Sequence, residues 1–474
     1  MLDLSFAAAV PALLVLAVLG DSGSGEPLPA RIRGVALTDL YAHRLLAELT
    51  AIGPRPASSP EAQEAVKWAL DTMEAMGLER VHSEPVTVRH WVRGPKERAV
   101  LLAGSGARAD ATGPAAAGPV PPAQDTELRV CALGGSIGTP AGGITAEVVE
   151  VRDWESLEKL ADSARGKIVF LNRPMPPDRL DTFDAYGAAA DQRAWGAMRA
   201  AKVGAVAVLV RSMTLSLTRH CHTGVMVYKD EEAPRIPAAA LATLDADLLS
   251  AVLARQGTAR VRLEMGCSEP GTVQTANTMG ELTGSEHPEE VVVLGGHIDS
   301  WDLGPGAHDD GAGCVQALDA LRILKQLGLK PRRTIRAVMF MDEEFGGAGG
   351  KAYAHDSARK NEKHVAAVES DRGGFRPLAF TVHGSDPAVE RVRSWLPDLG
   401  QAGIFTVEKG YGGVDIEPLS ESGTVTIGLV PESQRYFDMH HCANDTLDQV
   451  NPRELGLGAA AMAILAWKLS EEGL

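Results

Sequence analysis

Hydrophobic and polar positions recur along this chain with two different periods, one typical of helices and one typical of strands. Between residues 59 and 77, apolar side chains return at helical spacing after Ser59, a candidate N-cap, and Pro60 in the first turn. The pattern predicts an amphipathic helix over 59–77. Between residues 80 and 102, the segments VTVRHWV and RAVLL are strand-like, and they predict two strands.

Strand-like and helical patterns alternate from about residue 273 to the end of the chain. The strand-like segments are VVVLGGHID, TIRAVMFM and HVAAVESD, and a helical pattern covers 311–327. Asn451 and Pro452 mark the start of a last helix, whose apolar residues share one face. Alternation at this spacing predicts an α/β fold with a mostly parallel central sheet and helices on both faces.

The middle of the chain has a different composition and a different pattern of hydrophobic positions. Residues 103–126 are rich in Ala, Pro and Gly without periodicity, which predicts a long surface loop or linker. Residues 127–265 contain short strand-like segments, among them GKIVFL and AVAVLV, and one helical pattern at about 190–202. We interpret 127–265 as an inserted α/β module. It would separate 33–126, the N-terminal part of the main domain, from its core at 273–474.

The N-terminus carries the longest apolar stretch, residues 6–19. This stretch is shorter than the roughly 20 residues that a membrane-spanning helix needs, and polar, Gly-rich DSGSGE follows it. We interpret residues 1–20 as a cleaved signal peptide, which predicts a secreted or periplasmic protein without membrane contact after cleavage. A buried first helix is the alternative.

Length, charge and cysteine content exclude some classes of protein. A chain of 474 residues is long enough for two or three domains. It has 46 Lys and Arg against 62 Asp and Glu, a net charge of -16 without long single-sign runs, which argues against a nucleic-acid partner. The 5 cysteines are few and odd in number, so a disulfide framework cannot hold the fold together.

Acidic and imidazole side chains directly follow the predicted strands of the C-terminal half. Reactive groups of open α/β sheets collect where strands end. The candidates are His297 and Asp299, Asp309 and Asp310, Asp342 to Glu344, Asp371, and His440, His441 and Asp445. Alternation places His297 and Asp299 on one side of the chain, so the carboxylate can orient the imidazole, as happens at metal-binding histidines. The shared placement of these groups predicts one site.

Carboxylates and imidazoles in this ratio, without cysteine, suit zinc or a similar divalent ion. A pair of ions needs a bridging carboxylate. Three carboxylates, Asp309, Glu344 and Asp371, together with a bridging hydroxide would neutralise two divalent ions. Glu343 is then left over beside the metals, in the position of a general base.

At these residues the chain resembles the co-catalytic zinc exopeptidases of the leucyl aminopeptidase type. The shared motifs are GGHIDS, GAHDDGAG, DEEFG, ESD and His-x-x-x-Asp-Thr, and they span most of 273–450. The longer string GGHIDSWDLGPGAHDDGAGC and the insert segments GGSIGTPAGGITAEV, GAVAVLVRS and HTGVMVY resemble members of the carboxypeptidase Q type. The resemblance implies a zinc exopeptidase fold, with 127–265 as a protease-associated insert.

The resemblance also implies a ligand set for two zinc ions. One ion would be held by His297, Asp309 and Asp371, and the other by Asp309, Glu344 and His441. His441 is chosen over His440 because the ligand of the family lies four residues before the Asp-Thr pair. The predicted catalytic residues are Glu343 as the base and Asp299 beside His297.

The predicted function is a secreted di-zinc exopeptidase that hydrolyses dipeptides or short peptides through a metal-bridging hydroxide. An aminopeptidase of the same fold is the close alternative. A non-catalytic binding ectodomain and a single-zinc acyl-transfer enzyme such as a glutaminyl cyclase are the others. A small peptide is the expected partner, and the oligomeric state, a homodimer included, stays open.

Three further features have two interpretations each. His220, Cys221 and His222 could form a second metal site, or they could belong to the insert motif HTGVMVY. Arg372 could hold a substrate carboxylate, or it could point outward from the surface. The segment GYGGVDIEPLSESG, residues 410–423, has glycines and hydroxyls suited to a substrate-facing loop, or it could form a flexible surface turn.

Overall fold

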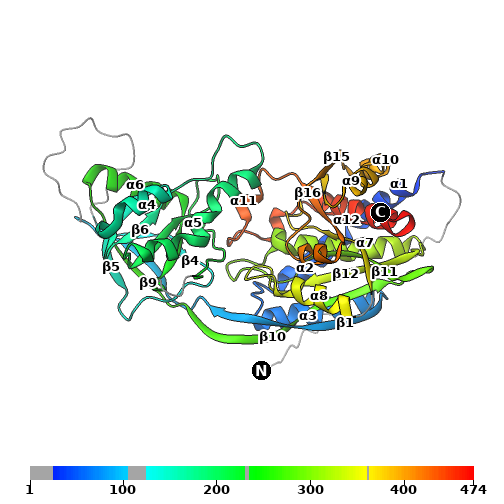
Figure 1. The fold of residues 1–474 in the computed structure, drawn as a ribbon, viewed down its shortest axis with the longest axis horizontal. Coiled ribbons are helices and arrows are strands. Elements are labelled where there is room, and N and C mark those ends of the chain that lie inside the picture. The colour runs from blue at the N-terminus through cyan, green and yellow to red at the C-terminus, as the bar shows by residue number, and fades with distance from the viewer. Residues whose placement is uncertain (1–24, 105–123, 230–233, 360–361) are drawn as a thin grey trace, which may run out of the picture.

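Two eight-stranded sheets organise the chain. The computed structural model describes residues 25–104, 124–229, 234–359 and 362–474, and the two sheets form two units that lie side by side (Figure 1). Each sheet has helices of its own. The predicted mixed α/β fold class is confirmed.

The first sheet has the strand order β1-β10-β12-β11-β13-β16-β14-β15. Its strands are β1 (Glu79–Val92), β10 (Ser268–Leu282), β11 (His287–His297), β12 (Arg333–Phe340), β13 (Lys363–Glu369), β14 (Pro377–His383), β15 (Thr406–Lys409) and β16 (Val425–Pro431). Strands β12, β11, β13 and β16 are parallel neighbours, whereas β10 and β14 pair antiparallel with the two ends of this group. The centre of the sheet is therefore parallel, as the alternating pattern predicts.

Helices cover both faces of the first sheet. They are α1 (Leu28–Asp39), α2 (Tyr41–Ala51), α3 (Pro60–Ala75), α7 (Ala312–Gln326), α8 (Ala348–Arg359), α9 (Asp386–Arg393), α10 (Leu396–Leu399) and α12 (Pro452–Glu472). The short helix α11 (Tyr436–Met439) instead packs into the core of the second unit. In β11, Val292 and Leu294 pack into the core that α7 and α12 share, while Val291 and Val293 pack on the other face with Tyr353 of α8. Because side chains alternate along a strand, this continuous apolar run buries both faces of β11.

Two predicted helix starts are confirmed by their caps. The N–H of Ala62 donates to Ser59 Oγ at 3.0 Å at the start of α3. At the start of α12, Asn451 Oδ1 accepts from the N–H groups of Arg453 (2.9 Å) and Glu454 (3.3 Å). Each cap satisfies main-chain donors that the first turn of a helix leaves without a partner.

The second unit is built on the sheet β3-β2-β9-β5-β6-β7-β8-β4. Its strands are β2 (Glu97–Leu101), β3 (Thr126–Leu128), β4 (Val130–Ala132), β5 (Ile144–Val151), β6 (Ile168–Leu171), β7 (Ala207–Arg211), β8 (Ala238–Leu241) and β9 (Arg260–Met265). Its helices are α4 (Trp154–Leu160), α5 (Thr182–Lys202) and α6 (Thr243–Gln256). The chain enters and leaves this unit through the long antiparallel pair β1 and β10 (Figure 1).

Short turns of other helical types complete the elements. They are η1 (Ala161–Ala164), η2 (Ala307–Gly311), η3 (Gly400–Ala402), η4 (Glu417–Ser422) and η5 (Leu447–Gln449). Of these, η2 bears on function because it carries acidic residues between β11 and α7.

Helix α5 is longer than its sequence pattern predicts. It begins at Thr182 instead of about 190, and the Asp181 carboxylate accepts from the N–H of Phe183 at 2.9 Å. The residues that this first half buries include Ala185 and Ala189. Their small side chains give little hydrophobic periodicity. The sequence pattern therefore predicts only the second half of helix α5.

The second sheet also begins earlier than residue 127, where the sequence analysis starts the insert. Strand β2 pairs antiparallel with β9 and β3, so residues 97–101 belong to this sheet. The predicted signal peptide, residues 1–20, and most of the predicted loop at 103–126 lie outside the described residues. All five cysteines are free. Among the described helices, none is long and apolar enough to cross a membrane.

Candidate metal centre

The predicted site residues meet at one edge of the first sheet. Strands β12, β11 and β13 are adjacent and parallel, so their carboxyl ends lie together. His297 ends β11, Asp342 to Glu344 follow β12, and Asp371 follows β13. The fold therefore brings together the groups that the sequence pattern places at strand ends, as open α/β sheets do.

Asp309 lies in η2, between β11 and α7. The Asp445 carboxylate accepts from the N–H groups of His308 (2.7 Å) and Asp309 (3.0 Å) and so fixes the main chain there. Asp310 accepts from the N–H of Gly313 at 2.9 Å, at the start of α7, and from the N–H of His297 at 3.1 Å. These contacts leave the Asp309 side chain to face the site, as predicted.

The first predicted ligand group is assembled around His297. Its Nε2 atom lies 3.4 Å from Asp309 Oδ1 and 3.5 Å from Asp371 Oδ1. The ligand atoms of these three residues all lie within 4.8 Å of one another. One imidazole and two carboxylates at this spacing form a set that can hold a divalent ion.

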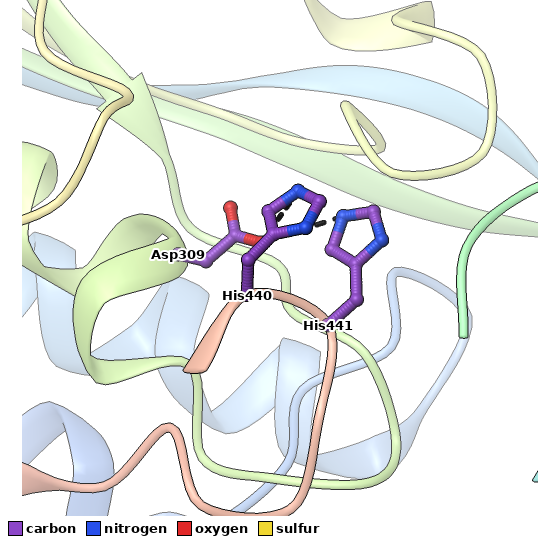
Figure 2. A group of neighbouring side chains, drawn as sticks. All are labelled: Asp309, His440 and His441. Carbon is purple, nitrogen blue, oxygen red and sulfur yellow. Dashed lines mark ion pairs between the residues drawn. The ribbon is translucent and has the colours of Figure 1, made fainter. Parts of the chain in front are cut away.

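The second predicted group lies on the other side of Asp309. His441 Nε2 is 3.1 Å from Glu344 Oε2 and 3.4 Å from Asp309 Oδ2. His440 stacks on His441 with ring centroids 3.5 Å apart, and its Nε2 is 3.8 Å from Asp309 Oδ2. Both imidazoles face the Asp309 carboxylate (Figure 2). Only His441 also lies within ion-pair distance of Glu344 among the contacts of the described residues.

Several of these ligand atoms are buried without a hydrogen-bond partner among the described residues. They are His297 Nε2, Asp309 Oδ2, Glu344 Oε1 and Asp371 Oδ1. Buried polar atoms of proteins are almost always hydrogen-bonded, so a group of orphaned ones that converge on one place points to a bound ion. Nitrogen and oxygen donors of this kind fit zinc.

The acidic side chains of the site lie so close together that each disfavours the ionisation of the others. Burial raises the pKa of Glu344 well above its usual value, and the carboxylates of Asp309 and Glu343 raise it further. Burial also raises the pKa of Asp371. Burial opposes ionisation of Asp309 too, but the imidazoles of His297, His440 and His441 together outweigh burial and lower the pKa of Asp309. Cations stabilise such a cluster of carboxylates.

The two neighbouring histidines are held neutral. Burial lowers the pKa of His440 to about 3 and that of His441 well below its usual value. A neutral imidazole is the form that binds metal ions. His297 differs: burial lowers its pKa, but the carboxylates of Asp299, Asp309 and Asp371 together outweigh burial and raise it.

Asp299 links His297 to the segment after β12. Its Oδ1 accepts from the N–H groups of Asp342 (2.8 Å) and Glu343 (3.3 Å). His297 Nδ1 is 3.7 Å from the same Oδ1 but only 3.0 Å from the main-chain oxygen of Asp299. The main-chain oxygen is thus the nearer partner of the imidazole, and the carboxylate holds the backbone that carries the proposed base.

The remaining sequence candidates have other environments. His220, Cys221 and His222 do not belong to a metal-type cluster among the described residues. The Arg372 guanidinium lies over the Phe183 ring, 4.7 Å from its centroid, so it packs against α5 of the insert. In the 410–423 segment, the Glu369 carboxylate accepts N–H groups of residues 414–416, which ties the segment to the end of β13.

Two contributors to the site have no sequence signal of their own. Arg55 is fully buried, and its Nε donates to the oxygen of Ile298 at 2.8 Å, while its N–H donates to Ser300 Oγ at 3.0 Å. It thereby holds the segment that follows β11. Thr223 of the insert reaches His441, with its main-chain oxygen 3.3 Å from His441 Nδ1. No periodicity or motif spacing indicates that residues 223 and 441 meet.

Comparisons with known proteins agree with this fold. Residues 277–466 match peptidase family M28. Bovine carboxypeptidase Q is 35% identical over 431 residues, which cover 90% of this chain and 84% of the bovine protein. The crystal structure of a peptidase M28 precursor from Shewanella amazonensis has a TM-score of 0.86 and 35% identity and covers 94% of this chain and 96% of that one.

A zinc aminopeptidase from Bacillus subtilis shares the fold, with a TM-score of 0.62 and 19% identity over 91% of this chain and 95% of that one. The fold, the carboxylate and imidazole site and these relatives together define a zinc metallopeptidase. The chain belongs to peptidase family M28.

Proposed function

We propose that this protein is a di-zinc exopeptidase that hydrolyses dipeptides or short peptides, with Glu343 as the general base. The observation that carries the proposal is the position of Asp309. Its Oδ1 lies 3.4 Å from His297 Nε2, and its Oδ2 lies 3.4 Å from His441 Nε2. A carboxylate that turns one oxygen to each of two ligand groups has the geometry of a metal bridge.

In this proposal His297, Asp309 and Asp371 hold one zinc ion, and Asp309, Glu344 and His441 hold the other. Zinc ions so placed lower the pKa of water and polarise a scissile carbonyl. Glu343 accepts a proton from the attacking water and passes it to the amine that leaves. Asp299 holds the N–H of Glu343 and so positions this carboxylate.

The specificity of the enzyme depends on whether it recognises the carboxyl or the amino terminus of the peptide. Relatives named carboxypeptidase Q, at 34–35% identity, favour cleavage that depends on a free carboxyl terminus. An aminopeptidase of the same fold is the alternative. Mass spectrometry of the products from free, N-blocked and C-amidated dipeptides separates the two, with a chelator as the metal control. Loss of cleavage after C-amidation alone supports a carboxypeptidase, and loss after N-blocking alone supports an aminopeptidase.

Two other classes make different predictions. A binding protein that has lost catalysis would lack ligands, whereas all five proposed ligand residues are present and close together. A single-zinc acyl-transfer enzyme would hold one ion per chain. Elemental analysis of the purified protein therefore tests the proposal directly, and a stoichiometry of one zinc would contradict it.

Substrate size gives a prediction for activity. We expect free dipeptides to be cleaved and folded proteins to stay intact, because an exopeptidase recognises a chain end. Zinc-replete enzyme is incubated with a dipeptide set and with casein, and both products are examined by mass spectrometry. Efficient internal cleavage of casein would be decisive against an exopeptidase.

Export gives a second prediction. The mature protein should begin near Asp21 and lie outside the cytoplasm, because residues 6–19 have the length and polarity of a signal peptide. N-terminal sequencing of protein from its native host measures this. Recovery of an intact N-terminus from Met1 to Gly20 would show that no signal peptide is removed.

A further inference from the structure

A short segment of the insert, His222 and Thr223, lies against the pair of histidines at the metal centre. The Thr223 N–H donates to the main-chain oxygen of His441 at 3.0 Å, and the Thr223 oxygen is 3.3 Å from His441 Nδ1. His222 Nδ1 lies 2.7 Å from the main-chain oxygen of His440. Three contacts thus join two residues of the insert to two residues of the catalytic unit.

The segment is itself fixed inside the insert. The Thr223 hydroxyl donates to the oxygen of Ala132 at 2.8 Å, and the N–H of His222 donates to Ser212 Oγ at 3.1 Å. One residue further on, the N–H of Gly134 donates to the oxygen of Gly224 at 2.9 Å. The contacts reach strand β4 and the residue that directly follows β7, so the segment is anchored to the framework of the insert.

The Thr223 contacts involve atoms of His441 that do not face the ligand group, and the His222 contact holds the main chain one residue earlier, at His440. A histidine that binds a metal through Nε2 carries its proton on Nδ1, and a hydrogen bond from Nδ1 fixes both tautomer and ring orientation. The Thr223 oxygen is placed to accept that proton, and Arg193 Nη1 of α5 lies 3.4 Å from both this oxygen and His441 Nδ1. His441 also has a left-handed backbone, with φ of 59°, which a residue with a side chain rarely adopts. Contacts from outside the segment are needed to hold it there.

We propose that His222 and Thr223 are positioning residues for His441, so that the insert sets the affinity of the zinc ion that His441, Glu344 and Asp309 hold. The inference rests on the proposed two-zinc function. It assigns the insert a role inside the metal centre, in addition to any role in enclosing substrate.

His222 offers a clean substitution. The oxygen of His440 can only accept, so His222 Nδ1 must carry the proton. The other ring nitrogen, Nε2, is buried without a hydrogen-bond partner among the described residues. Phenylalanine keeps a ring in this place and removes only the donor. Asparagine restores an N–H at the same number of bonds from the main chain as Nδ1.

The experiment measures zinc bound per chain over a series of zinc-buffered solutions, by elemental analysis. Wild-type protein should fill two sites. In H222F we expect one site to weaken by about tenfold and the other to keep its affinity. The change releases the main chain of His440 next to the ligand His441, and lost support around a metal ligand commonly has an effect of this size. H222N should recover most of the affinity. The D371N variant is expected to retain the zinc ion that His441 is proposed to hold. Adding H222F to D371N should lower the affinity for this remaining ion.

A matched control is H364F. His364 lies on β13, its side chain is buried, and its Nε2 contacts the Tyr353 hydroxyl at 2.9 Å. Among the described residues, its hydrogen-bond and ion-pair partners do not include residues 440 and 441. This variant should bind zinc like the wild type. A wild-type titration in H222F, or equal weakening of both sites in H222F, overturns the inference while the two-zinc function stands. A wild-type protein that fills only one site overturns the two-zinc function and this inference with it.

Discussion

Replacing Glu343 with glutamine is expected to lower kcat by roughly 100- to 10,000-fold. The amide of glutamine has the shape of the carboxylate but cannot accept a proton from water or return one to the leaving amine. Zinc content should stay at the wild-type value, because Glu343 is not among the proposed ligands. Steady-state kinetics on a free dipeptide, with elemental analysis of the same preparation, measures both quantities.

The structure supports this separation of base and ligand. Glu343 is half-buried at the end of β12, and its N–H donates to Asp299 Oδ1 at 3.3 Å. Its neighbour Glu344 is buried, with Oε2 3.1 Å from His441 Nε2. Burial raises the pKa of Glu343 well above its usual value, and the carboxylates of Asp371 and Asp309 raise it further.

The adjacent residue provides the control. Glu344→Gln is the same chemical change one position along, and it should cost a zinc ion as well as activity. If Glu343→Gln kept near-normal turnover, or if it lost zinc as Glu344→Gln does, Glu343 would not be the base.

Much of the central architecture is predictable because it depends on patterns within single elements. The apolar run of β11 predicts a strand buried on two faces, and Ser59 and Asn451 predict helix starts that their hydrogen bonds confirm. Parallel strands end at one edge of a sheet, so the residues after β11, β12 and β13 had to meet. The candidate site follows from topology and from chemistry that occurs directly in the sequence.

The structural features that the sequence does not predict depend on contacts between distant segments or on weak hydrophobic patterns. Helix α5 starts early because small alanines face its core side, and alanines carry little periodic signal. Strand β2 joins the second sheet through pairing with β9, and no local pattern encodes such a partner. Thr223 meets His441 for the same reason: 218 residues separate them, and only the folded insert brings them together.

The second large effect concerns Asp309 and distinguishes a bridging ligand from a terminal one. Asp309→Asn is expected to retain at most a trace of either zinc ion, whereas Asp371→Asn should keep close to one per chain. An asparagine amide offers a single neutral oxygen, so it cannot serve two ions, and it removes a negative charge that both ions share. Elemental analysis after identical dialysis of the two variants measures the difference.

The contacts around Asp309 allow the zinc contents of Asp309→Asn and Asp371→Asn to be compared directly. Its main chain is held by Asp445, which accepts the N–H groups of His308 and Asp309, so the loop keeps its anchor when the side chain changes. Asp371 lies close to His297 Nε2, at 3.5 Å, and none of its ion-pair contacts among the described residues reaches His441. Asp371→Asn should therefore weaken only the ion that His297 binds.

Equal zinc loss in the two variants, with both still folded by circular dichroism, would mean that Asp309 does not bridge. The bridge would then have to come from another carboxylate that reaches both imidazoles. Glu344 contacts His441 but makes no ion pair with His297 among the described residues, and Asp371 contacts His297 alone. Among the described residues, only Asp309 has oxygens within 3.4 Å of both His297 Nε2 and His441 Nε2, so the geometry predicts the unequal loss.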